Sequence, residues 1–190
     1  MTLPDDPVNL LQDPSVIVIT TDVRGNLGPA EVMLNNGTDW IKDRWQAASD
    51  MHGTAVKGSH WVRLEFPSSV SIQSLVLDWE AAYANDYKVQ ILPEGGTDNN
   101  SDWQTIYDGE DPAQTSTLLK VQELGQSPGV KTKTPLHVVH SIGPLVPRTT
   151  TVGTATVSTS TRSVRIWIRR SVTGWGVSLW QIQLYGRYQQ

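Results

Sequence analysis

Seven short segments of the sequence alternate apolar and polar residues, and most of them end at glycine, proline or another turn residue. Successive side chains on a β-strand point to opposite sides, so this alternation predicts strands with one buried face. The segments are HWVRLEF (60–66), SIQSLVLDW (71–79), DYKVQIL (86–92), DWQTIY (102–107), PLHVVHSI (135–142), SVRIWIRR (163–170) and VSLWQIQLY (177–185). No stretch has a sustained apolar period of 3.6 residues with helix caps. The pattern therefore predicts an all-β fold, most simply a β-sandwich.

Segment 163–170 shows how such a strand divides its residues. Val164, Ile166 and Ile168 fall on one face, and the arginines and the tryptophan between them fall on the other. We expect the aliphatic face to lie in the core.

The length of 190 residues fits one domain, residues 1–190, with room for a sizeable core. Two segments do not look like core. Residues 93–102 (PEGGTDNNSD) are polar and predict a hairpin tip. Residues 143–163 are rich in Thr, Ser, Gly and Pro, and they predict either a long loop or an exposed hairpin.

Charge and cysteine content exclude several classes of function. The 15 Lys and Arg residues against 19 Asp and Glu residues give a formal charge of −4 and a pI near 5.5, so no basic surplus is present to bind nucleic acid. The absence of cysteine excludes disulfides and thiolate metal sites. The longest apolar run near the start, VIVI (16–19), is too short for a signal peptide or a membrane span.

Segment 79–87 (WEAAYANDY) crowds aromatic and acidic residues where a strand-like alternation ends. It fits a turn whose aromatics close the core, and it equally fits a loop that presents them to a ligand. The eight tryptophans against one phenylalanine fit both, because the indole combines an apolar face with a polar N–H group.

The order of these segments resembles the coagulation factor V/VIII type C domain, also called the discoidin domain, and most closely carbohydrate-binding module family 32. The motifs that carry the resemblance are NNGTDWIKDRW (35–45), HWVRLEF, SLVLDWEAAYANDYKVQIL (74–92), DWQTIYDG (102–109), SVRIWIRR and GWGVSLWQIQLYG (174–186). The resemblance covers residues from about 30 to 186, with 110–162 the least regular part. The resemblance implies a galactose-binding-like jelly-roll β-sandwich of two antiparallel sheets with adjacent termini. It also favours an extracellular or cell-surface location.

Members of this family bind ligands with loops at one end of the sandwich, which correspond here to residues 36–58, 80–86 and 170–176. Sugar recognition needs an aromatic plate and polar groups for the hydroxyls. The resemblance places Gln46 and Glu80 where galactose-binding relatives often have histidine and arginine, so it implies a glycan without specifying galactose. The implied ligand-binding residues are Trp40, Gln46, His52, Glu80, Tyr83, Asn85, Arg170 and Trp175.

Other aromatic residues in these motifs have structural explanations. Trp45, Trp61 and Trp79 fall at strand positions that the family buries, and Tyr87 is also expected in the core. Arg44 precedes a buried tryptophan, so we expect it to hold its own loop by donating hydrogen bonds to carbonyl groups.

Many relatives hold a structural Ca²⁺ ion. The two carboxylates of that site correspond here to the neutral Asn36 and Gln181, with Asp39 or Asp43 as the candidate substitute ligand. The resemblance thus implies a weakened calcium site formed by these four residues.

Two further pairs of residues suggest other chemistry. His137 and His140 are three apart on a predicted strand and so face opposite sides, which argues against a shared zinc ion. Asp78 and Glu80 fall on the same face of a predicted strand, and this pair is the one sequence feature that favours a glycoside hydrolase. Carboxylates of such enzymes face each other across a substrate, whereas neighbours on one strand form a single wall.

The sequence thus favours a non-catalytic, lectin-like module that binds a glycan. The alternative is an adhesion domain for protein or phospholipid, for which Met51 and Val56 offer apolar tips, but membrane insertion suits an acidic protein poorly. A single sugar contact is weak, so oligomerisation or a larger parent protein is expected to supply avidity.

Overall fold

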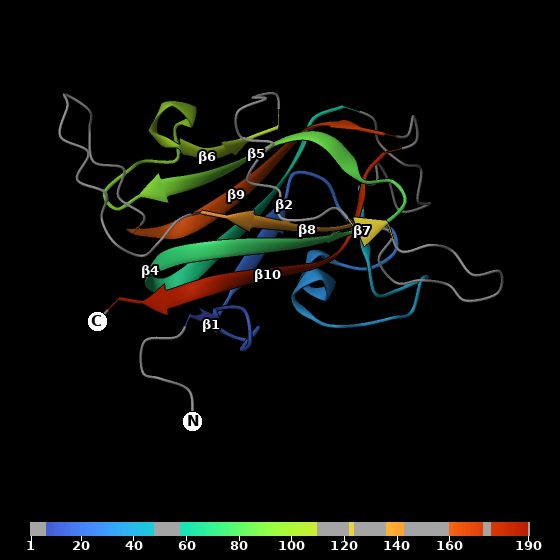
Figure 1. The fold of residues 1–190 in the computed structure, drawn as a ribbon, viewed down its shortest axis with the longest axis horizontal. Helices are drawn as coiled ribbons and strands as arrows, with labels where there is room; N and C mark the ends of the chain where they lie inside the picture. The colour runs from blue at the N-terminus through green and yellow to red at the C-terminus, as the bar shows by residue number, and fades with distance from the viewer. Residues whose placement is uncertain are drawn as a thin grey trace.

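β-Strands make up nearly all of the regular structure in the computed structural model of the chain (Figure 1). The structure describes residues 7–47, 58–109, 122–123, 136–142, 160–172 and 176–189. The strands are β1 (Val8–Asn9), β2 (Val18–Thr21), β3 (Trp45–Gln46), β4 (His60–Trp79), β5 (Ala84–Pro93), β6 (Gln104–Asp108), β7 (Gln122–Glu123), β8 (Leu136–Ser141), β9 (Ser160–Ser171) and β10 (Ser178–Tyr188). Two short 3-10 helices, η1 (Ala30–Leu34) and η2 (Asn100–Asp102), lie between strands.

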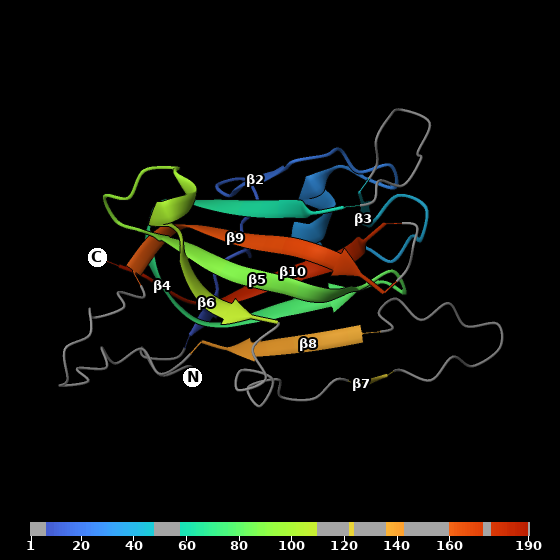
Figure 2. The same cartoon turned by 90° about the horizontal axis from the view of Figure 1, so that it is seen from above.

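Strand β4 belongs to two sheets. Its first half pairs with β2 and β9, and its second half pairs with β8 and β10, with a register shift between Glu65 and Val70. One sheet therefore runs β2-β4-β9-β5-β6, and the other has β4 between β8 and β10, with β1 and β3 paired to β10. Figure 2 shows β2 and β8 at opposite sides of the molecule. All pairings are antiparallel, which confirms the predicted all-β sandwich of two antiparallel sheets.

The core lies between the inward faces of these strands. Val164, Ile166 and Ile168 of β9 are buried, as their alternation predicts. Trp45 and Trp79 are fully buried too, and each large apolar side chain removed from water contributes about 1.5–3 kcal/mol to folding. Tyr87 is buried as well, so three of the four aromatic residues expected in the core are there.

The fourth, Trp61, is not in the core. It is half-buried on the face of β4 opposite to the buried Val62, and it lies across from Trp167 of β9. The expectation for Trp61 was wrong because the inward positions of this half-strand are His60, Val62 and Leu64.

Strand boundaries differ from the predictions in two places. Pro67 does not end a strand, because β4 continues through it where the chain passes from one sheet to the other. The expected loop at 143–163 is wrong for its last four residues: β9 begins at Ser160, and the hydroxyl of the buried Thr161 donates to the carbonyl groups of Leu92 and Ser163. Residues 143–159 lie outside the described ranges. The polar tip at 93–102 lies between β5 and β6 as expected.

The two ends of the described chain lie side by side, because Val8 and Asn9 of β1 pair with Gly186 and Tyr185 of β10. This pairing agrees with the adjacent termini that the resemblance implies. Within the described ranges, no helix is long and apolar enough to cross a membrane.

Candidate functional site

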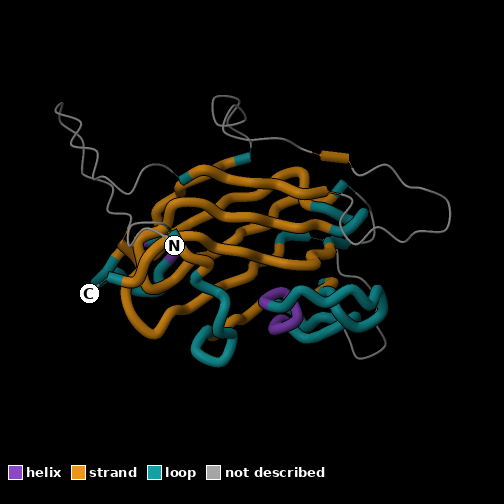
Figure 3. Tube along the Cα trace, turned by 60° about the horizontal axis from the view of Figure 1, so that its bottom comes forward, coloured by secondary structure: helices purple, strands orange, loops and turns teal. Residues whose placement is uncertain are grey.

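The described parts of the loops expected to bind a ligand gather at one end of the sandwich, and Figure 3 shows loops beside the helix at that end of the strands. Backbone hydrogen bonds tie them together. Glu80 N donates to Ser178 O at 3.1 Å, and Ser178 N donates to Ala82 O at 2.8 Å. Val172 N donates to Tyr83 O at 3.1 Å. We call residues 36–47, 80–86, 170–172 and 176–178 the rim.

Arg44 is the central side chain of the rim. It is only 2% exposed, and its Nε donates to the carbonyl oxygen of Trp40 at 2.9 Å, which confirms the expected hydrogen bond to its own loop. One terminal nitrogen donates to Ser178 Oγ at 2.7 Å and to Gln46 Oε1 at 3.1 Å. The same nitrogen lies 3.7 Å from Glu80 Oε2. Arg44 therefore joins three separate segments of the rim.

The charge of Arg44 is balanced inside the rim. Burial lowers the pKa of this guanidinium, and the carboxylate of Glu80 acts in the opposite direction. Arginine remains cationic in proteins, so the pair is an ion pair at neutral pH. Glu80 Oε2 also accepts from Ala82 N at 2.9 Å. Gln46 Oε1 and Glu80 Oε2 are both engaged within the rim. The amide nitrogen of Gln46 and Oε1 of Glu80 therefore remain to bind an external ligand.

Trp40 stands over this buried cation. The guanidinium carbon of Arg44 lies 4.2 Å from the centroid of the indole, a cation-π contact that fixes the ring. The residue is nevertheless 43% exposed, and the adjacent Ile41 is 68% exposed. The rim thus presents an ordered aromatic surface to solvent.

Tyr83, Asn85 and Arg170 form the other part of the rim. Tyr83 is half-buried and packs against the core, whereas Asn85 is exposed. The side chain of Arg170 is 67% exposed and reaches within 4.0 Å of the carboxylate of the buried Asp86. That carboxylate also accepts from Arg169 at 2.8 Å. Arg170 is therefore an exposed cation at the edge, while Arg169 is the hydrogen-bonded partner of Asp86.

Two predicted ligand-binding residues, His52 and Trp175, lie outside the described residues. The structure brings Trp40, Gln46 and Glu80 together around Arg44. The remaining three, Tyr83, Asn85 and Arg170, lie next to this group along the edge of the rim.

Two of the four residues expected to bind calcium, Asp39 and Asp43, shape their own loop. Asp43 Oδ2 accepts from the backbone N–H of Asp39 at 2.8 Å, and Asp39 Oδ1 accepts from that of Ile41 at 2.9 Å. The hydrogen bond from Ile41 is the main reason that the pKa of Asp39 is lowered. Asp39 also pairs with Lys42 at 3.6 Å, so a cation would compete with this lysine.

Asn36 and Gln181 add only neutral oxygens. Asn36 is exposed, and Gln181 is buried on β10 across from Asp78 of β4. Ca²⁺ affinity rises with the number of carboxylates. The donor set therefore fits a weak calcium site at most.

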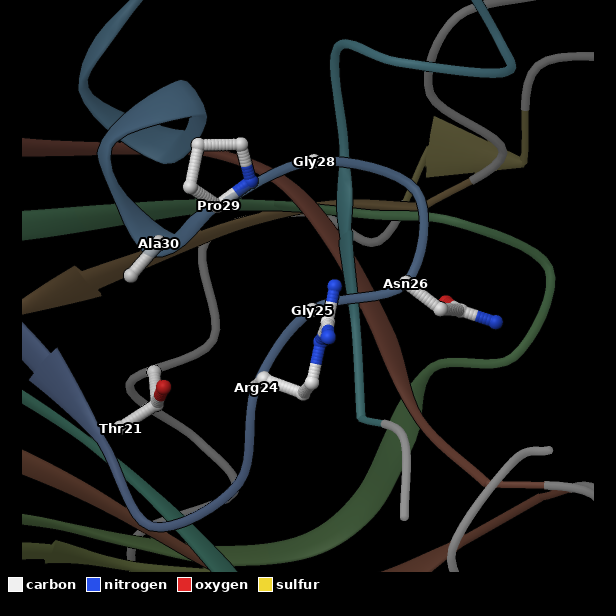
Figure 4. A pocket seen from close by; sticks show the side chains of 7 residues that line it. All are labelled: Thr21, Arg24, Gly25, Asn26, Gly28, Pro29 and Ala30. Carbon is white, nitrogen blue, oxygen red and sulfur yellow. The ribbon is translucent and has the colours of Figure 1, made fainter. Parts of the chain in front are cut away.

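The loop formed by residues 21–30 packs against the rim segment 36–47. Residues Thr21 to Ala30 curve around a cavity of about 360 Å³ (Figure 4). Leu27 O accepts from Arg44 N at 3.3 Å, and Asn26 N donates to Gln46 O at 3.2 Å. Gly28 has a φ of +142° and a side chain there would collide with Lys42 O, so glycine is required at this contact.

The residues that suggested other chemistry have separate environments. Strand β4 ends at Trp79, so the expectation that Asp78 and Glu80 share one strand face was wrong: Asp78 is buried within the sheet, while Glu80 pairs with Arg44. His140 is buried, and its Nε2 lies 2.6 Å from the hydroxyl of Tyr87. Among the described residues, no group of three or more His, Cys, Asp or Glu side chains is placed to hold a metal ion.

Comparison with protein-family models and with curated proteins gives no match for the sequence. Solved structures do match. Chitosan-binding module 1 of a chitosanase/glucanase from Paenibacillus sp. IK-5 aligns with a TM-score of 0.57 and 21% identity, over 94% of this chain and 99% of that chain. Module 2 of that enzyme, in complex with chitotriose, aligns with a TM-score of 0.55 and 19% identity, over 90% and 97%.

A family 32 carbohydrate-binding module from C. perfringens NanJ, in complex with galactose, aligns with a TM-score of 0.56 and 8% identity. That alignment covers 95% of this chain and 98% of the module. Identities this low establish the fold alone. The chain therefore has the galactose-binding-like β-sandwich fold of the family 32 carbohydrate-binding modules.

Proposed function

We propose that this protein is a non-catalytic carbohydrate-binding module that recognises a glycan at the rim. The observation that carries the proposal is Trp40, an indole fixed on a buried guanidinium and still 43% exposed beside polar side chains. An exposed, ordered ring can stack on the apolar face of a sugar, and the Gln46 amide, Glu80 and Asn85 can bind its hydroxyl groups. Structures of the same fold bind galactose and chitotriose, which supports a glycan as the ligand class.

The absence of catalysis is part of the proposal. Glycoside hydrolases use two carboxyl groups that flank the scissile bond. Asp78 is buried in the sheet, and Glu80 is engaged by Arg44 and by the backbone of Ala82, so the two do not form such a pair. We expect no release of reducing sugar from any glycan that the protein binds.

A glycan array with the purified chain tests the proposal, followed by isothermal titration of each hit with Trp40→Ala. We expect the substitution to weaken binding by about tenfold or more, because it removes the stacking surface. Ile41→Ala is the matched control, since it removes exposed apolar surface next to Trp40 without removing an aromatic ring. It should change affinity by less than about twofold.

The same two variants distinguish glycan binding from the second candidate function, which is binding to a phospholipid surface. Trp40, Ile41 and Val172 are exposed apolar side chains in the rim, as insertion into lipid would require. In that case both substitutions would reduce sedimentation with liposomes. Binding of liposomes together with a silent array would overturn the glycan proposal.

Calcium is proposed only as a weak stabilising ligand of the 36–43 loop. With a dissociation constant of about 1 mM, about 10 mM calcium should stabilise the fold by about 1.4 kcal/mol and raise Tm by about 3–6 °C. Asp43→Asn should remove the response. Equal Tm values in calcium and in chelator would contradict the assignment.

We place the protein outside the cell or at its surface because of its resemblance to carbohydrate-binding modules. One rim offers a single sugar site, whose affinity is expected to be low. Oligomerisation or tethering within a larger protein would then raise avidity by about 10²–10⁴.

A further inference from the structure

The outer face of the β4-β9-β5 sheet carries a second group of ligand-type residues, away from the core. On this face Trp167 of β9 pairs with Lys88 of β5, and Arg165 pairs with Gln90. A cavity of about 200 Å³ opens here, lined by Lys88, Gln90, Asn100, Arg165, Trp167 and Arg169. We call it the sheet-face pocket. None of its lining residues belongs to the rim.

Arg165 is fixed at the base of this pocket. It is 8% exposed, and its Nε and one terminal nitrogen donate to Gln90 Oε1 at 3.1 and 2.8 Å. The other terminal nitrogen donates to Asn100 Oδ1 at 3.1 Å. Its guanidinium lies between the indoles of Trp103 and Trp167, at 4.3 and 4.8 Å from their centroids. The group is therefore held in one orientation before any ligand arrives.

Arg165 has no carboxylate within ion-pair distance among the described residues. Its hydrogen bonds all go to neutral amide oxygens. Burial lowers its pKa, and the more distant carboxylate of Asp98 acts in the opposite direction. A buried cation is costly unless an anion compensates it. The other two cations of the pocket differ in this respect, because Lys88 pairs with Asp108, and Arg169 with Asp86 and Asp108. Within the described part of the chain, Arg165 is therefore the cation of this pocket that lacks a paired carboxylate.

The polar lining of the pocket is rich in donors. The amide oxygens of Gln90 and Asn100 accept from Arg165, so the amide nitrogen of Asn100 is left to donate outward. None of the described residues that line the cavity carries a carboxylate. A ligand that supplies acceptor oxygens and negative charge would match such a surface, whereas a neutral sugar would leave these donors only partly satisfied.

Trp167 gives the pocket an apolar wall. The residue is half-buried and lies beside Arg165, so one part of the indole is packed and another part borders the cavity. A flat apolar wall next to fixed cations is suited to a sugar ring that carries a carboxylate. A volume of about 200 Å³ is below the range of about 300–1,000 Å³ usual for drug-sized ligands, so it suits a single sugar residue.

We propose that the sheet-face pocket is a second carbohydrate-binding site, which takes a hexuronic acid residue with its ring against Trp167 and its carboxylate toward Arg165 and Lys88. This site does not depend on the rim. Trp167 and Arg170 are three residues apart on β9, about 10 Å along the strand, so the two sites are neighbours but use different side chains.

Titration of the full chain with trigalacturonate tests the proposal, with galactotriose as the neutral probe of similar size. Trigalacturonate should bind, and binding should weaken by about tenfold or more in Trp167→Ala and by several-fold in Lys88→Gln. It should also weaken between about 0.01 M and about 0.15 M ionic strength, as the screening length falls from about 30 to about 8 Å. Trp40→Ala, the rim variant, should leave it unchanged.

Three results would overturn the proposal. Equal affinity for galactotriose would show that the carboxylate is not recognised. Equal affinity for inorganic phosphate would make the pocket a simple anion site. Loss of trigalacturonate binding in Trp40→Ala but not in Trp167→Ala would place the acidic sugar in the rim. Failure of the rim to bind any glycan would leave the expected response of Trp167→Ala unchanged, so the two proposals fail separately.

Discussion

Replacing Arg44 with methionine should lower the free energy of unfolding by about 3–5 kcal/mol, the usual effect of removing one partner of a buried ion pair. The substitution leaves Glu80 without its partner at 3.7 Å and removes the donor to Ser178 Oγ. It also removes the cation beneath Trp40. Urea unfolding monitored by tryptophan fluorescence measures the change.

Arg170→Met is the matched control for this experiment. It removes the same charged group from a side chain that is 67% exposed, so it should change stability by less than about 0.5 kcal/mol. A loss below about 1 kcal/mol in Arg44→Met would show that Arg44 does not hold the rim together.

The second large effect is on the pH dependence of stability. Burial lowers the pKa of His140 from 6.5 to about 4, and the residue is 2% exposed. Between these values the unfolded chain binds a proton that the folded chain does not, so stability must fall as the pH falls. The full contribution is present above pH 6.5 and is lost by about pH 4. Since one pKa unit corresponds to about 1.4 kcal/mol, the loss should be about 3 kcal/mol.

Two tyrosines lie against the imidazole. Its Nε2 lies 2.6 Å from the hydroxyl of Tyr87, and its ring centroid is 4.2 Å from that of Tyr107. Burial also raises the pKa of Tyr87, so this hydroxyl stays protonated and can donate to the imidazole. Among the described residues, burial is the cause that shifts the pKa of His140, and no carboxylate acts on this imidazole in the opposite direction.

His140→Gln separates this effect from the other titrating groups. Glutamine can still bond to Tyr87 but does not titrate, so the difference in stability between the two proteins should vary by about 3 kcal/mol between pH 6.5 and about 4. Asp98 and Asp102 have lowered pKa values, through hydrogen bonds from Arg63 and Thr97, and they act in both proteins at lower pH. Parallel stability curves for the two proteins would contradict the assignment.

Much of the fold could be predicted because period-two alternation reports burial directly. All seven alternating segments fall wholly or mostly in strands, two of them in β4, and the buried aliphatic residues of β9 are those the pattern selects. The short strand β2 and the helix η1 were not predicted, since four or five residues carry too little pattern. Pro67 was misread as a strand end because the passage of β4 between sheets depends on pairing with four distant strands.

The site could be predicted only as a set of loops. The motif around residue 44 indicated an arginine that binds its own loop, and it does. Its contact with Ser178 joins residues 134 apart in the sequence, and its position under Trp40 depends on how the loop folds, so neither could be read from spacing. The sheet-face pocket was missed for a related reason: Arg165 and Trp167 were recognised as the outward face of a strand, but Asn100 reaches them from the polar tip.

The most direct test of glycan binding at the rim is a ¹H–¹⁵N NMR titration of the chain with a sugar identified on the array. We expect the shifts of residues 38–46 and 80–86 to change most, together with the indole N–H of Trp40, and the core strands to remain unchanged. Shift changes confined to other parts of the sandwich, or none at saturating sugar, would contradict the proposed site.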